Sequence, residues 1–385
     1  MTQTLALRRL LGDAVRAYGA MDFDDGDEGP CPRRLPDWTR PQLPEAVDLM
    51  ARMPSGVRLQ FSTDTTRLGV AFLATARHMV DRPRRPMVFN LETEGRIHSA
   101  RSDLGNTMIV DPRAPGGLEF IRGEPDTVWF SDLAPGHKNC ELWLPHNAFV
   151  ELRSLMVEDG ARVAPMTPDT RAKWIHYGSS ISQCAEAEEP AYIWPAVAAR
   201  RANVAMQNLG LSGQCHLDQF VARTIRDADA DIVSIKTGIN IVNMDSMRER
   251  VFRPALHGFL DTVREGKPDA PVLAVSPIFC PGAETRPGPM MRHASTGKFD
   301  TIKGFDEIRN GCMSLQRVRE IIAEVVDTRR GSGDDRLYYL DGLTLFGAVD
   351  AEDLPDDLHP NAAGYIRIGE RFAPTLRRLA GLAGR

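Results

Sequence analysis

Two different rhythms of apolar and polar residues divide the chain near residue 168. Before this point, short strand-like segments follow one another and are separated by turns rich in glycine and proline. The clearest is residues 57–62, where Val57, Leu59 and Phe61 alternate with polar side chains. Further strands are expected at 67–73, 87–92, 108–110, 118–121, 127–130 and 140–144. Many short strands at this spacing predict an all-β sandwich over residues 1–167.

The first twenty residues have a helical pattern instead. Leu7, Leu10, Leu11, Ala14 and Val15 recur at the spacing of one helix face. We therefore expect a helix over residues 1–20, ahead of the strands.

After Pro168, apolar strands alternate with amphipathic helices. The expected strands are 173–177, 204–209, 231–236, 271–276 and 337–340, and the expected helices are 191–202, 217–226, 246–265, 305–328 and 361–380. The third helix opens with Ser246-x-x-Glu249, a capping-box pattern. Such alternation predicts an α/β domain over residues 168–385, with a parallel sheet covered by helices on both faces. Ligands of these folds bind beyond the carboxyl ends of the strands, so the turns after the strands are where chemistry is expected.

The composition is that of a globular protein with two domains. The chain has 385 residues, of which 42% are hydrophobic and 26% charged, which excludes collagen, coiled coil and wholesale disorder. Lysine and arginine number 47 against 52 aspartates and glutamates, a net charge of −5. A protein without basic excess is not expected to bind nucleic acid or an anionic membrane surface.

Targeting signals and cysteines favour a cytoplasmic protein. Arg8 and Arg9 interrupt the apolar stretch near the N-terminus, so a secretory signal is not expected. No apolar run reaches the roughly 18 residues of a membrane span. The six cysteines are scattered, with no spacing typical of a zinc site, and reduced thiols are expected.

Four short polar segments stand where the turns of the second domain are expected. They are Gly178-Ser179-Ser180-Ile181, Gly210-Leu211-Ser212-Gly213, Gly238-Ile239-Asn240 and Asp356-x-x-His359. Each alone is ordinary turn sequence. Together they place a hydroxyl, backbone donors, an amide and an Asp/His pair at one edge of one sheet.

In this order, the four segments resemble the signature blocks of the GDSL/SGNH serine hydrolases and acyltransferases. The resemblance covers residues 170–385 and implies a flavodoxin-like SGNH three-layer domain. It makes Ser180 the nucleophile, His359 the base and Asp356 its partner. It assigns the oxyanion hole to the backbone amides of Ser180 and Gly213 and to the side chain of Asn240. Two departures, a serine at 179 in place of the usual aspartate and no aspartate after Asn240, touch no triad position.

The chemistry of these residue types agrees with the resemblance. A serine hydroxyl needs a neighbouring base, and His359 can take its proton and later return one to the leaving group. Asp356, three residues earlier, can bend back to the far ring nitrogen and fix the imidazole tautomer. No cluster of metal ligands is visible in the sequence, and oxyanion donors replace a Lewis acid, so no metal is expected.

Other side chains near these segments have competing interpretations. Asp357 is an alternative partner for His359, although the spacing favours Asp356. Cys184 or Cys215 could act as nucleophile only with a base, and both are interpreted as packing residues. Structural roles are expected for the remaining neighbours: turns or caps for Ser179 and Ser182, core or surface positions for His176, His216 and Trp194.

Residues 277–304 follow a strand without clear periodicity. Long irregular segments inside a compact domain are commonly functional. This one is rich in proline and carries Met290, Met291, His293 and Phe299. We expect it to form one wall of the acyl or acceptor pocket.

The first domain supplies a second resemblance. Arg34-Leu35-Pro36-x-Trp38 and Lys138-x-x-Glu141-Leu142-Trp143 are similar to the jelly-roll, carbohydrate-binding-module-like sandwich of a two-domain GDSL subfamily. That subfamily includes the salicylyl acyltransferase of tetracycline-type antibiotic biosynthesis. The resemblance implies a serine acyltransferase that moves an aryl or short acyl group from acyl-CoA to a hydroxyl of a polyketide acceptor. The sandwich would then shape the pocket without chemistry of its own.

Two alternatives remain open at this point. One is an intracellular esterase or deacetylase of a small ester or acylated glycoside. The other is a lectin-like protein with an inactive catalytic domain, which the presence of Ser180, Asp356 and His359 disfavours. For the acyltransferase and for the esterase alike, the expected partners are a small-molecule acyl donor and a hydroxyl acceptor. No cofactor beyond the co-substrate, acyl-CoA, is expected.

Overall fold

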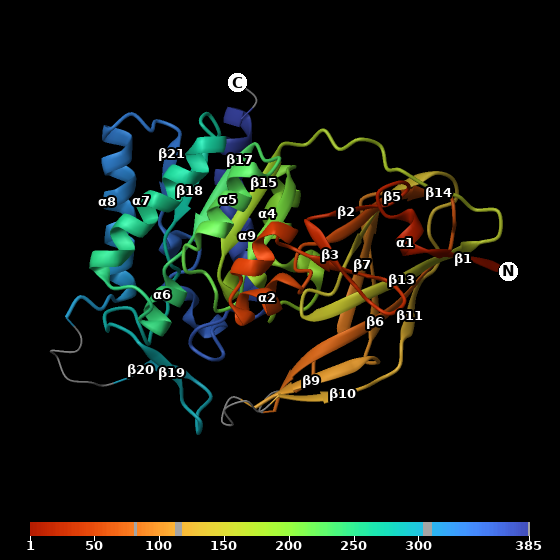
Figure 1. Cartoon of the computed structure of the whole chain (residues 1–385), viewed down its shortest axis with the longest axis horizontal. Coiled ribbons are helices and arrows are strands. Elements are labelled where there is room, and N and C mark those ends of the chain that lie inside the picture. Colours follow the sequence, from red (N-terminus) through yellow and green to blue (C-terminus); the bar gives the residue numbers. More distant parts are fainter. Residues whose placement is uncertain (81–82, 112–117, 303–309, 384–385) are drawn as a thin grey trace. The chain divides into compact units, whose positions relative to one another are not determined.

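The chain folds into two compact units (Figure 1). The computed structural model describes residues 1–80, 83–111, 118–302 and 310–383. The first unit comprises Met1–Thr170 with Glu189–Ala191, and the second Arg171–Glu188 with Tyr192–Arg385. Nothing in the sequence pattern predicts the assignment of 189–191 to the first unit, where the Glu189 carboxylate accepts hydrogen bonds from Asn90 and Ser99, both at 2.7 Å.

The first unit is the predicted β-sandwich. One sheet has the order β1-β13-β6-β9-β10, with β11 also paired to β6; the other has the order β14-β5-β12-β7-β8, with β2 paired to β5. The strands of the first sheet are β1 (Thr2–Ala6), β6 (Leu68–Met79), β9 (Asn106–Val110), β10 (Leu118–Ile121), β11 (Asp126–Phe130) and β13 (Ala148–Glu158). Those of the second are β2 (Arg16–Tyr18), β5 (Arg58–Thr63), β7 (Met87–Thr93), β8 (Arg96–Ser102), β12 (Lys138–Trp143) and β14 (Val163–Ala164). Apolar side chains of both sheets form one buried core, in which the rings of Phe72 and Phe89 lie 4.6 Å apart.

The predicted helix over residues 1–20 is wrong. The structure has a strand, β1, then one helical turn, α1 (Leu7–Leu10), then the strand β2. Gly12 and Gly19 adopt φ of +87° and +91°, and β1 pairs along its whole length with β13. Hydrogen bonding to a distant strand has overridden the local helical pattern here.

Residues 22–51 form a small attachment to the sandwich, with the hairpin β3 (Asp22–Asp25) and β4 (Pro30–Arg33), the 3₁₀ helix η1 (Asp37–Gln42) and the helix α2 (Glu45–Ala51). Arg34 is fully buried, and its guanidinium donates to the carbonyl oxygens of Met50 at 2.7 Å and Met53 at 2.5 Å, where α2 ends. Burial lowers the pKa of Arg34 to about 9. Arg34, part of the motif that carried the second resemblance, therefore stabilises the end of a helix.

The second unit is the predicted α/β domain (Figure 1). Five parallel strands have the order β16-β15-β17-β18-β21, which is the 2-1-3-4-5 order of flavodoxin-like folds. They are β15 (Lys173–Gly178), β16 (Ala205–Gly210), β17 (Ile232–Lys236), β18 (Val272–Val275) and β21 (Leu337–Leu340). Helices α4 (Trp194–Ala202) and α9 (Ala362–Ala383) pack together on one face, where the ring of Trp174 stacks on Phe372 at 5.4 Å. Helices α5 (Gln219–Asp227), α7 (Glu249–Gly266) and α8 (Leu315–Gly331) lie on the other, where Tyr177 stacks on Phe259 at 5.5 Å.

Several helix boundaries differ from the predicted ones. Helix α7 begins after Arg248, so the predicted capping box at 246 is wrong, and Ser246 instead lies 2.8 Å from a ring nitrogen of His216. Helix α8 begins at Leu315, where the Ser314 hydroxyl caps it, ten residues after the predicted start. Positions 305–309 of that prediction lie outside the described residues.

Shorter elements escaped the sequence pattern altogether. They are α3 (Ser180–Gln183), α6 (Ile239–Met244), the hairpin of β19 (Met290–Arg292) and β20 (Phe299–Thr301), and the 3₁₀ turns η2 (Pro190–Tyr192), η4 (Gly342–Thr344) and η5 (Ala348–Asp353). Each is too short to show a period of its own.

Candidate active site

Ser180 is the first residue of α3, which follows the strand β15 directly. Ser179 is the N-cap, and its hydroxyl accepts a hydrogen bond from the Ile181 amide at 3.3 Å, the capping role expected for it. The neighbouring turn packs closely against α3, since a Cβ added to Gly210 would lie 2.4 Å from the backbone nitrogen of Gln183. This close approach holds the end of α3, the short helix that carries Ser180 at its start.

His359 connects Ser180 and Asp356 through its two ring nitrogens. Its Nε2 lies 3.0 Å from Ser180 Oγ, and its Nδ1 lies 2.9 Å from Asp356 Oδ2. The other carboxylate oxygen of Asp356 accepts hydrogen bonds from the backbone amides of Leu358 at 3.1 Å and His359 at 2.7 Å. A carboxylate held in this way keeps the proton on Nδ1 and leaves Nε2 to accept from the serine.

These three predicted residues are largely shielded from water. Ser180 is 7% exposed, and the side chains of Asp356 and His359 are 10% and 13% exposed. Asp357, the alternative partner, forms an ion pair with Lys298 instead, with Nζ 3.0 Å from Oδ2. Hydrogen bonds strengthen in such a water-poor setting, which is what proton transfer between these groups requires.

The predicted oxyanion donors follow three adjacent strands, β15, β16 and β17. Gly213 has a φ of +72°, a conformation that favours glycine. Asn240 is 4% exposed, and its Oδ1 accepts a hydrogen bond from the Cys215 amide at 3.0 Å. The NH₂ group of Asn240 is therefore the part of its side chain left to donate. Ser180, Gly213 and Asn240 thus lie along one edge of the sheet, and their joint use by an oxyanion stays a prediction.

His176 lies beneath α3 in a buried hydrogen-bonded chain. Trp174 Nε1 donates to Ser234 Oγ at 2.8 Å, Ser234 Oγ lies 2.7 Å from His176 Nδ1, and His176 Nε2 lies 2.7 Å from Ser182 Oγ. Burial, reinforced by the charge of Lys236, lowers the pKa of His176 to about 3, so the ring is neutral. In a neutral ring one nitrogen donates and the other accepts, so His176 can bond both serine hydroxyls at once. His176 is therefore a core residue that ties the helix of the nucleophile to the neighbouring strand.

The remaining histidine and cysteines near the motifs have structural contacts. His216 Nε2 lies 3.0 Å from the carbonyl oxygen of Gly213 and braces that turn. Cys184 and Cys215 are fully buried, and burial raises the pKa of Cys215 to about 12 and that of Cys184 well above its usual value. Thiols that stay protonated are poor nucleophiles, which agrees with a packing role.

The irregular segment 277–304 reaches the turn that carries Asp356 and His359. The backbone amide of Phe299 donates to the Asp356 carbonyl oxygen at 3.1 Å. The Phe299 ring lies edge-on to the imidazole, with 6.0 Å between ring centroids and 78° between their planes. The last two residues of the segment, 303 and 304, lie outside the described residues.

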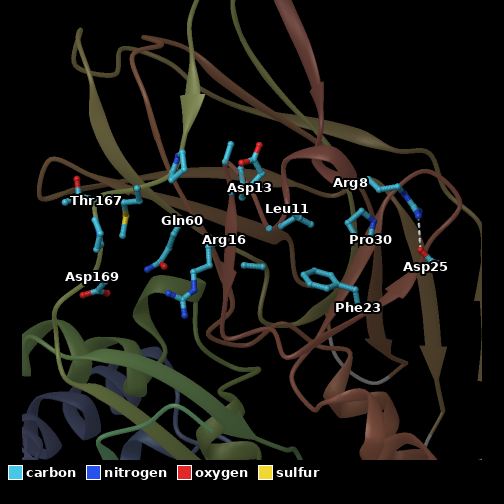
Figure 2. Close-up of a pocket in the computed structure, with 17 residues that line it drawn as sticks. Arg8, Leu11, Asp13, Arg16, Phe23, Asp25, Pro30, Gln60, Thr167 and Asp169 are labelled. Atoms are coloured by element: carbon cyan, nitrogen blue, oxygen red, sulfur yellow. Dashed lines mark hydrogen bonds and ion pairs between the residues drawn. The ribbon is translucent and has the colours of Figure 1, made fainter.

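A cavity of about 680 Å³ lies within the first unit (Figure 2). Its lining combines Leu11, Arg16, Phe23 and Gln60 with the segment 165–169. Arg8, on its rim, pairs with Asp25 at 2.8 Å. None of the predicted catalytic residues belongs to it, so the pocket-shaping role expected of the sandwich stays a prediction.

Neither a metal-binding cluster nor a membrane-spanning helix is found in the described part of the chain. No group of three or more histidine, cysteine, aspartate or glutamate side chains there is arranged to hold a metal ion. Nor does any helix there combine the length and the apolar character needed to cross a membrane.

Comparison with protein families gives one match for each unit. The GDSL-like Lipase/Acylhydrolase family matches residues 172–280, and the SsfX3 N-terminal domain matches residues 15–153. The first match contains Ser180, Gly213 and Asn240, whereas Asp356 and His359 lie beyond it. None of the curated proteins matches the chain significantly.

Solved structures with the same architecture cover both units. The salicylyl-acyltransferase SsfX3 from a tetracycline biosynthetic pathway has a TM-score of 0.79 and 25% identity, over 100% of this chain and 98% of its own. A protein described as a GDSL-like lipase from Bacteroides ovatus has a TM-score of 0.69 and 18% identity, over 98% of both chains. A family two carbohydrate esterase from Clostridium thermocellum, in complex with cellohexaose, has a TM-score of 0.58 and 17% identity, over 96% of this chain and 99% of its own. The last two likenesses concern the fold.

Proposed function

We propose that the chain is a serine acyltransferase, on the premise that residues 172–280 match the GDSL-like Lipase/Acylhydrolase family. It would move an aryl or short acyl group from acyl-CoA to a hydroxyl of a polyketide-like acceptor. The observation that carries the chemistry is the hydrogen-bonded series from Ser180 Oγ through His359 to Asp356. Transfer to a large acceptor is favoured because an acyltransferase of a tetracycline pathway shares both units, at 25% identity over the whole chain.

Acylation begins at Ser180. As its oxygen attacks the thioester carbon, His359 Nε2 takes the hydroxyl proton and Asp356 stabilises the resulting imidazolium. The negative charge on the former carbonyl oxygen is received by the amides of Ser180 and Gly213 and by Asn240, each donor typically contributing about 10²–10³ in rate. The carbon–sulfur bond then breaks, the thiolate takes the proton from His359, and acyl-Ser180 remains.

Deacylation repeats these steps with the acceptor. Its hydroxyl gives its proton to His359 as its oxygen attacks the acyl carbon, and the Ser180 oxygen leaves and recovers that proton. Water can replace the acceptor in the same step. A hydrolase of a small ester or acylated glycoside is therefore the second candidate, and it shares the acyl-Ser180 intermediate.

Mass spectrometry of the intact protein tests the proposal. Incubation with a panel of acyl-CoAs should add one acyl group to the wild-type chain and none to Ser180→Ala. Ser332→Ala, an exposed serine after α8, is the matched control and should load normally. Addition of a hydroxylated acceptor should then discharge the acyl group into an ester. Discharge to free acid alone favours the hydrolase, and a Ser180 inert to both acyl-CoAs and fluorophosphonate favours the lectin-like alternative.

A further inference from the structure

The hairpin of β19 and β20 is held against the turn that carries the predicted catalytic pair. At its inner end, the Phe299 amide donates to the carbonyl oxygen of Asp356. Lys298, the preceding residue, pairs with Asp357 through both carboxylate oxygens, at 3.0 and 3.2 Å. The thiol of Cys280, at the start of the same irregular segment, donates to the Asp357 carbonyl oxygen at 3.2 Å. The position of Phe299 relative to the turn is therefore fixed from several directions.

The Phe299 side chain uses this position to contact His359. The two rings are nearly perpendicular and 6.0 Å apart, the edge-on arrangement that aromatic pairs favour. His359 must receive a proton from the attacking molecule in deacylation, so a group beside its ring influences which molecule can approach. An apolar ring at this position offers water no hydrogen bond.

Phe299 also lines a cavity of about 310 Å³, whose lining includes neither Ser180 nor His359. Phe299 and Asp357 line it together with Asp300, with residues between the two strands of the hairpin and with residues of the segment before it, namely Pro281, Gly282, Arg286, His293, Thr296 and Lys298. Its volume is at the lower end of the range of small-molecule sites, enough for one ring system with its substituents. Phe299 and Pro281 make part of its wall apolar among polar side chains, which suits an aromatic alcohol better than a simple alkyl group.

We infer that Phe299 determines what attacks the acyl-serine. Its ring excludes water from one side of His359 and forms the apolar wall on which the ring of an aromatic acceptor alcohol packs. This inference rests on the proposed transferase function and names the residue that favours transfer over hydrolysis. The reaction itself is unchanged: the acceptor oxygen forms the new ester bond, the bond to Ser180 breaks, and one proton passes through His359.

The test measures the products of one common intermediate. Enzyme acylated by p-nitrophenyl acetate is offered benzyl alcohol or methanol, and the ratio of acetate ester to free acetate is measured by chromatography. A ratio of products from the same acyl-enzyme does not depend on how much protein is folded. Apolar contacts that differ between two substrates typically change selectivity about 10–200-fold. Phe299→Ala should therefore lower the ester-to-acetate ratio with benzyl alcohol by about tenfold or more, and with methanol much less.

Two further variants sharpen the result. Phe299→Tyr keeps the ring and should retain most of the wild-type ratio. Phe120→Ala removes an exposed phenylalanine of the sandwich and should leave the ratio unchanged. An unchanged ratio in Phe299→Ala, with transfer intact in the wild type, overturns this inference alone. A wild type that is acylated at Ser180 but yields only acetate with every alcohol overturns the transferase proposal, and this inference with it.

Discussion

Replacing Asp356 by asparagine and by alanine should separate two tasks of its carboxylate. One oxygen accepts the amides of Leu358 and His359, and the other accepts His359 Nδ1–H. In Asp356→Asn, the oxygen can still serve both amides, but an NH₂ group then faces Nδ1. The imidazole must carry its proton on Nε2, where it cannot accept from Ser180.

The expected loss of activity follows from the free energy needed to turn the asparagine side chain so that its oxygen faces Nδ1. Turning the asparagine amide over restores an acceptor for Nδ1–H but leaves two backbone N–H groups facing an NH₂ group. At about 1–3 kcal/mol for each unsatisfied donor, the competent orientation is disfavoured by about 2–6 kcal/mol. The rate of acylation should therefore fall by about 30-fold to 3 × 10⁴-fold, since 1.36 kcal/mol corresponds to a factor of ten.

The alanine variant adds a loss of stability. It leaves both amides without their acceptor, so the free energy of unfolding should fall by about 2–6 kcal/mol, whereas Asp356→Asn should stay within about 1 kcal/mol of the wild type. Release of p-nitrophenol from p-nitrophenyl acetate measures acylation, and urea unfolding measures stability. Asp356→Asn with more than a tenth of wild-type activity, or Asp356→Ala as stable as the wild type, refutes this account of the turn.

Three further outcomes are expected. The pKa of the buried His176 is lowered to about 3, whereas the unfolded chain takes up this proton near pH 6.5. The free energy of unfolding should therefore fall as the pH drops from 6.5 towards 3, by up to about 1.4 kcal/mol per pH unit. Urea unfolding at pH 7.5 and pH 5 should show a smaller fall in His176→Asn than in the wild type, and equal falls would contradict the neutral ring. A thiol reagent at pH 8 should label the native chain at Cys31 and Cys312 at most, since the other four cysteines are buried, and all six after unfolding; fast labelling of a buried thiol, detected by peptide mass spectrometry, would argue against the core packing. Gly210→Ala should reduce acylation by about tenfold or more, because its Cβ would lie 2.4 Å from the backbone of α3 and displace the nucleophile; wild-type kinetics in a folded variant would show that this close approach does not matter.

The sequence was sufficient for the α/β unit because its signals are local. Each buried strand is an apolar run of the right length, and each is followed by an amphipathic helix. Parallel strands carry their carboxyl ends to one edge, so polar turns after them must meet there. That reasoning brought Ser180, Asn240, Asp356 and His359 to one region, where the structure places the hydroxyl 3.0 Å from the imidazole.

Local pattern was misleading where distant partners compete. The leucines of residues 1–20 have helical spacing, yet β1 finds a full set of hydrogen bonds along β13. The strand Arg58–Thr63 alternates as if one face met water, but all six residues are buried, and Arg58 is accommodated by an ion pair with Glu141 at 3.0 Å. The strand β13 and Glu141 are both far from their partners in the sequence, so the pattern of apolar residues predicts neither the pairing of β1 nor the burial of Arg58.

The sequence alone determined the alternation of strands and helices after residue 168 and the residue types available for acyl transfer, because these follow from periodicity and from turn chemistry. The flavodoxin-like sheet was implied by the resemblance to the GDSL/SGNH family. Only the tertiary structure decided which of two adjacent aspartates contacts His359, that His176 is buried beneath α3, and that Phe299 reaches the imidazole. These are contacts between side chains far apart in the chain or on opposite sides of a turn. They depend on packing in three dimensions, for which no spacing along the sequence is a substitute.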